Sequence, residues 1–209
     1  MSRTKSSAKW LKEHFSDEFV KKAQKLGYRS RAAFKLIEIQ EKDRLIKPNM
    51  HVIDLGAAPG GWSQVIAKWL GQNGRLISLD ILPIVPFENF QNIVYIQGDF
   101  RETSIFDNIL ESLHHEKVDV ITSDLAPNTS GMSDVDQPRA MVLAELSLEL
   151  AVKILKTGGS LVVKVFQGEG YDQFLKVLKQ HFQKVVIRKP LASRNRSREN
   201  YLVAKGFMV

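Results

Sequence analysis

The sequence of 209 residues contains no cysteine. Disulfide bonds, cysteine-ligated metal sites and thiolate nucleophiles are therefore excluded. Long apolar runs are missing as well: none reaches the roughly 18 residues that a membrane span requires, so no membrane association is expected. The segment Met1–Lys5 is polar and basic, which does not fit the apolar core of a secretory signal. These absences favour a cytoplasmic protein.

Charge, in contrast, is abundant and unevenly placed. Residues 1–47 hold 13 Lys/Arg against 6 Asp/Glu, and residues 184–209 hold 7 against 1. Residues 48–183 hold 10 Lys/Arg against 16 Asp/Glu. Two basic ends thus flank an acidic middle, and they would form one positive face if they met in space. Such a face suits a polyanion such as RNA, and two solvated basic tails are the alternative.

Short apolar runs alternate with amphipathic ones along the chain, which predicts a mostly parallel sheet with helices on both faces. We expect seven strands, at Met50–Leu55, Arg75–Asp80, Ile93–Gln97, Val118–Ser123, Gly159–Phe166, Val185–Arg188 and Tyr201–Ala204. The last two are close in sequence, so a hairpin would make the final strand antiparallel. Helices are expected at Trp62–Leu70, at Thr103–His115, and on the apolar faces Leu143–Ile154 and Phe174–Phe182.

The domain organisation predicted from this pattern is a single α/β domain of Rossmann-like type, spanning residues 1–209. Residues 1–47 would be a basic helical extension, with helices at Ser7–Leu26 and Ser30–Asp43. Residues 48–209 would be the catalytic core. In an open sheet of this kind, ligands bind beyond the carboxyl ends of the strands.

A glycine-rich turn follows the first expected strand, in the segment Val52–Trp62. Gly56, Gly60 and Gly61 would let a ligand approach the backbone closely, and a tight turn without a ligand is the alternative. The spacing matches neither the G-x-G-x-x-G dinucleotide fingerprint nor the Walker phosphate loop. Instead, the pattern Asp-x-Gly-x-x-Pro-Gly-Gly resembles the first motif of methyltransferases that use S-adenosyl-L-methionine.

Aspartates end four successive strands, or follow them closely, at Asp54, Asp80, Asp99 and Asp124. A pocket that holds a cationic sulfonium and a neutral nucleoside suits such an acidic lining. Asp80 is placed to accept hydrogen bonds from the ribose hydroxyls of the cofactor, and Asp99 to accept one from the adenine amino group. Each aspartate alone could be a helix cap or a loop residue.

The acceptor of the methyl group can be narrowed by elimination. Methylation of pyrimidine carbon 5 uses a cysteine adduct, and cysteine is absent. Methylation of exocyclic amines uses an Asn/Asp-Pro-Pro-aromatic loop, which Ser123–Asn128 does not match. A hydroxyl remains, and it needs a positioned base but no metal.

Lys164 is the candidate base, because it interrupts the apolar strand Ser160–Phe166. Burial and a second cation nearby would lower its pKa toward neutrality. An adjacent carboxylate would instead favour the ammonium form, and the sequence leaves open which effect wins. A lysine whose stem packs while its head reaches water is the alternative.

Five ordered segments resemble motifs of the FtsJ/RrmJ family of ribosomal RNA 2′-O-methyltransferases: Arg29–Leu36, Asp54–Trp62, Ser123–Gly131, Val163–Gly168 and Ser193–Tyr201. The resemblance covers nearly the whole chain. It implies S-adenosyl-L-methionine-dependent methylation of a ribose, in a uridine of 23S ribosomal RNA on the assembled 50S subunit. It also implies a catalytic tetrad of Lys35, Asp124, Lys164 and Glu199. Cofactor contacts are implied for Gly60, Trp62, Asp80, Asp99 and Asp124.

Two groups of basic residues are expected to contact RNA. Arginines alternate with small polar residues at Arg194, Arg196 and Arg198, and the N-terminal extension supplies Lys21, Lys22, Lys25, Arg29 and Arg31. Nothing in the sequence demands more than a monomer. Two alternatives stay open: 2′-O-methylation of transfer RNA or an mRNA cap, and a non-catalytic ribosome-assembly factor. The glycine spacing disfavours a nicotinamide dehydrogenase.

Overall fold

The computed structural model describes residues 17–128, 130–193 and 197–208. Seven strands in these ranges form one sheet, in the order β3-β2-β1-β4-β5-β7-β6. They are β1 (His51–Leu55), β2 (Arg75–Asp80), β3 (Ile93–Gln97), β4 (Val118–Ser123), β5 (Leu155–Phe166), β6 (Phe182–Arg188) and β7 (Glu199–Phe207). The first five are parallel, and β7 runs antiparallel to both β5 and β6. The predicted Rossmann-like α/β class is therefore confirmed.

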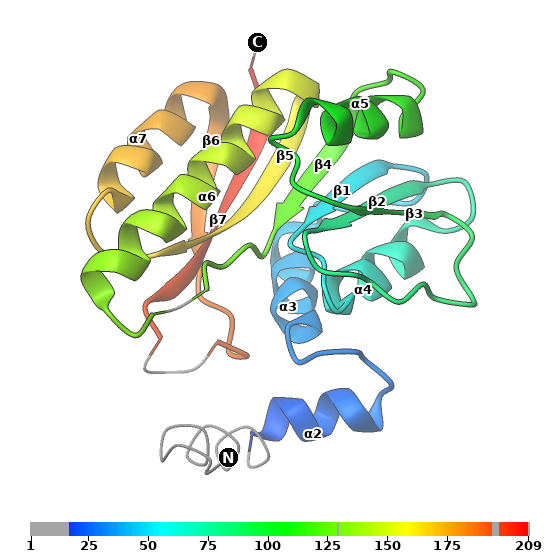
Figure 1. Ribbon diagram of the computed structural model, residues 1–209, viewed down its shortest axis with the longest axis horizontal. Helices are drawn as coiled ribbons and strands as arrows, with labels where there is room; N and C mark the ends of the chain where they lie inside the picture. Colours follow the sequence, from blue (N-terminus) through cyan, green and yellow to red (C-terminus); the bar gives the residue numbers. More distant parts are fainter. Residues whose placement is uncertain (1–16, 129, 194–196, 209) are drawn as a thin grey trace.

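Helices cover both faces of the sheet (Figure 1). They are α2 (Glu18–Lys25), α3 (Ala33–Asp43), α4 (Gly61–Leu70), α5 (Thr103–Ser112), α6 (Ser133–Ile154) and α7 (Tyr171–His181). One buried cluster joins the sheet to α5, α6 and α7, and a second joins it to α3 and α4. None of these described helices is both long and apolar enough to span a membrane.

Several boundaries differ from the sequence-based expectation. β5 begins at Leu155 rather than Gly159, because Leu155 pairs with Val118 before the register shifts. β7 extends beyond Tyr201–Ala204 on both sides, since its flanks pair with β5 and β6. Phe182, expected on a helical face, is the first residue of β6.

The N-terminal extension packs against two distant parts of the core. Leu36 of α3 is buried in the cluster with α4, whereas Phe34 packs with Ala192 of the loop between β6 and β7. The Asp43 carboxylate, at the end of α3, accepts hydrogen bonds from Arg188 of β6 at 2.8 and 3.0 Å. It also forms an ion pair with Lys205 of β7 at 3.1 Å. α3 is therefore an integral part of the domain. Residues 7–16 of the expected first helix lie outside the described residues.

Candidate active site

The loop between β1 and α4 is shaped by glycine. Gly56 has a φ of 72°, and its backbone amide and that of Ala57 donate to the carbonyl of Leu79 on β2. A Cβ atom at Gly56 would lie 3.0 Å from the backbone of Leu125, in the loop after β4. Glycine is thus required here because the loops after β1 and β4 approach each other closely. This approach brings the carboxyl ends of the central strands to one site.

Asp80 and Asp99, two of the residues expected to bind the cofactor, are held by different partners. Asp80 is fixed, because its carboxylate accepts from the amides of Ala58 and Leu82, each at 2.9 Å. Asp99 is held by Arg101, whose Nε lies 2.9 Å from both carboxylate oxygens and lowers the pKa of Asp99. A nucleoside would therefore meet Asp80 already oriented, but would have to share Asp99 with Arg101.

Asp54, one of the four aspartates at the strand ends, is the most deeply buried of them. Its carboxylate is fully buried and accepts from Ser63 at 2.7 Å and from Thr122 at 2.9 Å. Burial raises the pKa of Asp54 to about 7, the two hydrogen bonds oppose the rise, and the charges of Asp124 and Asp80 add to it. Asp124 and Asp80 lie near enough to Asp54 to affect its pKa, so the strand ends form an acidic lining that a cation would stabilise. The residues present therefore fit the sulfonium of S-adenosylmethionine.

The remaining loop residues also contact the N-terminal extension. A Cβ atom at Gly61 would lie 2.1 Å from the Ser30 hydroxyl, so a larger residue would force this hydroxyl to move. The Trp62 indole donates to the carbonyl of Ala32 at 2.8 Å, and the side chain is buried. Its backbone amide, in the first turn of α4, is the group left for a cofactor. Gly60, with a φ of 108°, lies directly beneath Arg29.

The acceptor side begins at Lys164 of β5, which is 8% exposed. Its Nζ lies 3.0 Å from Oδ1 of Asp124 and donates to the Asp124 carbonyl at 2.6 Å. Burial favours a higher pKa for Asp124, but the charges of Lys164 and Lys35 and the hydrogen bonds from Tyr201 and Lys164 outweigh it. The Asp124 pKa therefore lies below its ordinary value, and the carboxylate is ionised.

The other two members of the expected tetrad form a second ion pair. Nζ of Lys35 on α3 lies 2.7 Å from Oε1 of Glu199 on β7. The same carboxylate oxygen accepts from the hydroxyl of Ser193 at 2.8 Å. The structure thus brings together four charged groups from α3, the β4 loop, β5 and β7.

Tyr201 joins the two ion pairs. Its hydroxyl donates to Oδ1 of Asp124 at 2.7 Å and accepts from Nζ of Lys35 at 3.2 Å. Burial, followed by the charges of Asp124 and Glu199, raises the Tyr201 pKa well above its ordinary value, so the phenol stays neutral. Tyr201 was not among the residues predicted for the site. The available signal was the period of two along a strand, which puts Tyr201 on the same face as Glu199.

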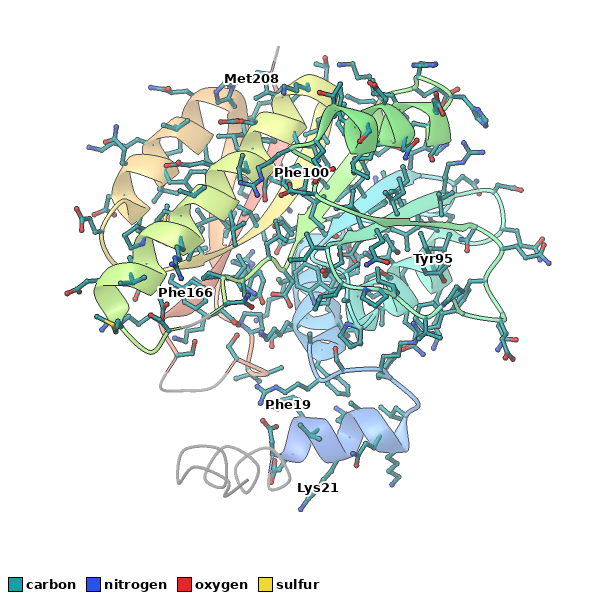
Figure 2. All side chains as sticks on the ribbon, viewed as in Figure 1. Phe19, Lys21, Tyr95, Phe100, Phe166 and Met208 are labelled. Atoms are coloured by element: carbon teal, nitrogen blue, oxygen red, sulfur yellow. The ribbon has the colours of Figure 1, made fainter. Side chains whose placement is uncertain are left out.

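The basic residues of the extension divide into two kinds. Lys21, Lys22 and Lys25 are exposed on α2, and Lys21 points away from the body of the protein (Figure 2). Arg31 is instead engaged internally, with the carboxylate of Asp17 and the carbonyl of Ala192. Arg194 and Arg196 lie outside the described residues. Of the residues expected to bind RNA, the α2 lysines are therefore accessible, whereas Arg31 is engaged within the protein.

The sequence of the chain is similar to those of known proteins. The model of the FtsJ-like methyltransferase family matches residues 28–207. Proteins named ribosomal RNA large subunit methyltransferase E are similar over nearly the full chain. That of Pseudomonas fluorescens is 56% identical over 207 residues, which are 99% of this chain and 98% of that protein. That of Pseudomonas aeruginosa is 55% identical over 99% of both chains.

Solved structures agree with this result. A protein described as a ribosomal RNA methyltransferase from Plasmodium falciparum has a TM-score of 0.76 and 32% identity, over 86% of this chain and 98% of that one. Aeropyrum pernix fibrillarin, solved with S-adenosyl-L-methionine bound, shares the fold with a TM-score of 0.51 and 18% identity, over 76% of this chain and 67% of that one. The chain therefore belongs to the FtsJ-like methyltransferase family, and its cofactor is S-adenosyl-L-methionine.

Proposed function

We propose that this enzyme methylates the 2′-hydroxyl of a ribose, in a uridine of 23S ribosomal RNA on the assembled 50S subunit. The names of the most similar relatives support ribosomal RNA of the large subunit as the substrate. The observation that carries the ribose assignment is the buried Lys164, which meets Asp124 beside the carboxylate-lined cofactor site. A base that touches the cofactor site suits an acceptor that must lose a proton during attack.

The contacts of Lys164 support a role as proton acceptor. To accept a proton, the ammonium beside Asp124 must first release one to solvent, and the resulting neutral amine has two hydrogens and one lone pair. Both hydrogens are engaged if they point to the carbonyl and to Oδ1 of Asp124, the two contacts that Lys164 makes. The lone pair then faces away from Asp124, toward an incoming hydroxyl. Asp124 acts in this way as an orienting group for the base.

The chemistry is a direct displacement. When bound, S-adenosylmethionine supplies a methyl group activated by the sulfonium. Nζ of Lys164 would accept the proton of the ribose hydroxyl as its oxygen takes up this methyl group. The chain's contribution is to hold the hydroxyl in line and to accept this proton.

The second ion pair serves the RNA. Lys35 and Glu199 are each 12% exposed, so both remain more accessible than the 6% exposed side chain of Lys164. Lys35 contacts the Tyr201 hydroxyl, which is itself fixed on Asp124. We infer that Lys35 binds the phosphate or ribose next to the target, with Glu199 setting its position. The exposed lysines of α2 extend this positive surface along the RNA backbone.

The test supplies methyl-labelled cofactor to 23S ribosomal RNA, intact 50S subunits and transfer RNA in parallel. Digestion to nucleosides then separates base methylation from ribose methylation. We expect label in 2′-O-methyluridine, from 50S subunits above all. Label on a base would refute the proposed acceptor, and label in transfer RNA alone would favour the alternative substrate. Cofactor binding without transfer to any substrate would favour an assembly factor.

A further inference from the structure

Arg29 lies between the N-terminal extension and the cofactor loops. Its guanidinium donates to the carbonyl of Pro59 at 3.2 Å, to that of Pro86 at 3.0 Å, and to that of Val85. The guanidinium carbon also stacks 3.4 Å from the centroid of the Phe87 ring. Pro59 belongs to the loop after β1, and the other three residues belong to the loop after β2. One side chain therefore ties both loops together.

The backbone of Arg29 is held as firmly as its side chain. Its amide donates to Oε1 of Gln64 on α4 at 3.1 Å, and the Gln64 amide group donates to the carbonyl of Gly27 at 2.8 Å. The guanidinium lies so close to Gly60 that a Cβ there would be 3.0 Å from Nη1. Arg29 is thus a fixed bridge whose two terminal nitrogens are already engaged by backbone carbonyls.

The loop held by Arg29 begins directly after Asp80, the fixed carboxylate of the cofactor site. Ile81 is 64% exposed and Leu82 is 59% exposed. Apolar side chains in this position suit a purine ring whose ribose lies at Asp80. The loop needs an anchor to present these side chains in one place, and the Arg29 contacts supply it.

We propose that Arg29 is a positioning residue for the cofactor: it holds the loop after β2 against the loop after β1, so that the adenosine end of S-adenosylmethionine meets a preformed site. This role differs from the phosphate contact expected from the sequence. A phosphate would have to displace backbone carbonyls and an aromatic ring from the guanidinium. The inference rests on the cofactor site of the proposed function, but not on the identity of the methyl acceptor.

The test compares Arg29→Lys and Arg29→Ala with the unchanged protein. Lysine keeps the charge but cannot reach three carbonyls in one plane. We expect both variants to bind S-adenosylmethionine about tenfold more weakly by calorimetry. Without the Arg29 contacts, part of the binding free energy is used to order the loop after β2. The KM for the cofactor should rise similarly, while kcat at saturating cofactor and the KM for RNA stay within about twofold.

Two further variants separate this role from general destabilisation. Phe87→Leu removes the stacked ring, and it should weaken cofactor binding in a way that is not additive with Arg29→Ala. Lys25→Ala removes one exposed charge from the same extension, and it should weaken RNA binding while leaving cofactor affinity unchanged. Thermal unfolding checks that each variant is folded.

The opposite pattern would overturn the proposal. If Arg29→Lys bound both ligands normally while Arg29→Ala lost only RNA affinity, Arg29 would be a phosphate ligand. Normal cofactor affinity in both variants would also refute the role of Arg29 as a positioning residue for the cofactor. Because cofactor binding is measured without RNA, methylation of an unexpected acceptor would leave this result interpretable.

Discussion

The two halves of the active site are built in different ways. The cofactor half uses neighbouring strand ends, where Asp54, Asp80 and Asp99 follow one another along the chain and the side chains are acidic. The acceptor half joins Lys35, Lys164 and Glu199 from segments far apart in the sequence. The first half is formed by the loops after β1 and β2, which Arg29 ties together, and the second depends on how α3 docks on the sheet. Variants can therefore damage one half and leave the other intact.

The largest effect is expected from Lys164→Ala. Loss of the proton acceptor should lower methyl transfer about 10³-fold, the order expected for a general base. Cofactor affinity should stay close to that of the unchanged protein, because the carboxylates of the first half are untouched. Single-turnover transfer and calorimetry measure the two quantities. Lys156→Ala, on the same strand but paired with Asp119, is the matched control and should keep its activity.

The pH dependence of stability tests the burial of Asp54 in the cofactor half. The pKa of Asp54 is about 7 in the folded protein against an ordinary value of 3.8, so the folded state binds this proton more tightly. The resulting stabilisation is full below pH about 4 and is lost as the pH rises through about 7. The difference corresponds to as much as about 4 kcal/mol in the free energy of unfolding. Asp54→Asn should flatten this decline in denaturant titrations.

The same proton should affect cofactor binding. A cation favours ionised Asp54, so affinity for S-adenosylmethionine should increase between pH 6 and 8 in the unchanged protein and less in Asp54→Asn. Asp172→Asn, an exposed site on α7, is the control and should keep the original profile. An identical pH dependence in all three proteins would show that Asp54 is not the titrating group.

Asp43 tests the docking on which the acceptor half depends. Its side chain is 2% exposed and is shared by Arg188 and Lys205. Asp43→Ala leaves two cations without their carboxylate and should cost about 3 kcal/mol of stability. Methyl transfer should fall more than cofactor affinity, because α3 also carries Lys35. Glu41→Ala, exposed on the same helix, should change stability by less than about 0.5 kcal/mol.

The smallest effect concerns the exposed lysines of α2. Lys25→Ala should reduce RNA affinity by less than tenfold and lower the slope of log affinity against log salt by about 1. Filter binding at several salt concentrations measures both. Lys179→Ala, on α7 away from α2 (Figure 1), should leave the slope unchanged. Equal effects of the two variants would mean that RNA binds by net charge alone.

The sequence allows a detailed prediction of the cofactor half because the signals for it are local. A strand, a glycine-rich turn and an aspartate at the next strand end all lie within Val52–Asp80. The mostly parallel sheet and the antiparallel last strand also followed from the alternation of elements and the short separation of the last two strands, whereas the strand order, with β7 between β5 and β6, was not predicted. The longer extent of β5 and β7 was not predicted either, since it depends on pairing between strands rather than on composition.

In the acceptor half, Lys164 was predicted from its place in an apolar strand, but Lys35 and Glu199 were reached only through the family resemblance, because these residues meet across the fold. No local pattern shows that Tyr201 would bridge Lys35 and Asp124. Basic residues were the hardest to interpret. Arg29, Arg31 and Lys25 have similar sequence surroundings, yet only Lys25 is exposed, while the two arginines find acceptors inside the protein. Which cation stays available for RNA is decided by tertiary contacts.

The position of β7 has a consequence for synthesis on the ribosome. β7 follows β6 along the chain but is inserted between β5 and β6, so both strands lack their partner until β7 has emerged. An unpaired strand edge is prone to wrong association, and a nascent chain at this stage needs protection. Glu199 and Tyr201 arrive with the same strand, so translation completes the sheet and the catalytic centre in one event.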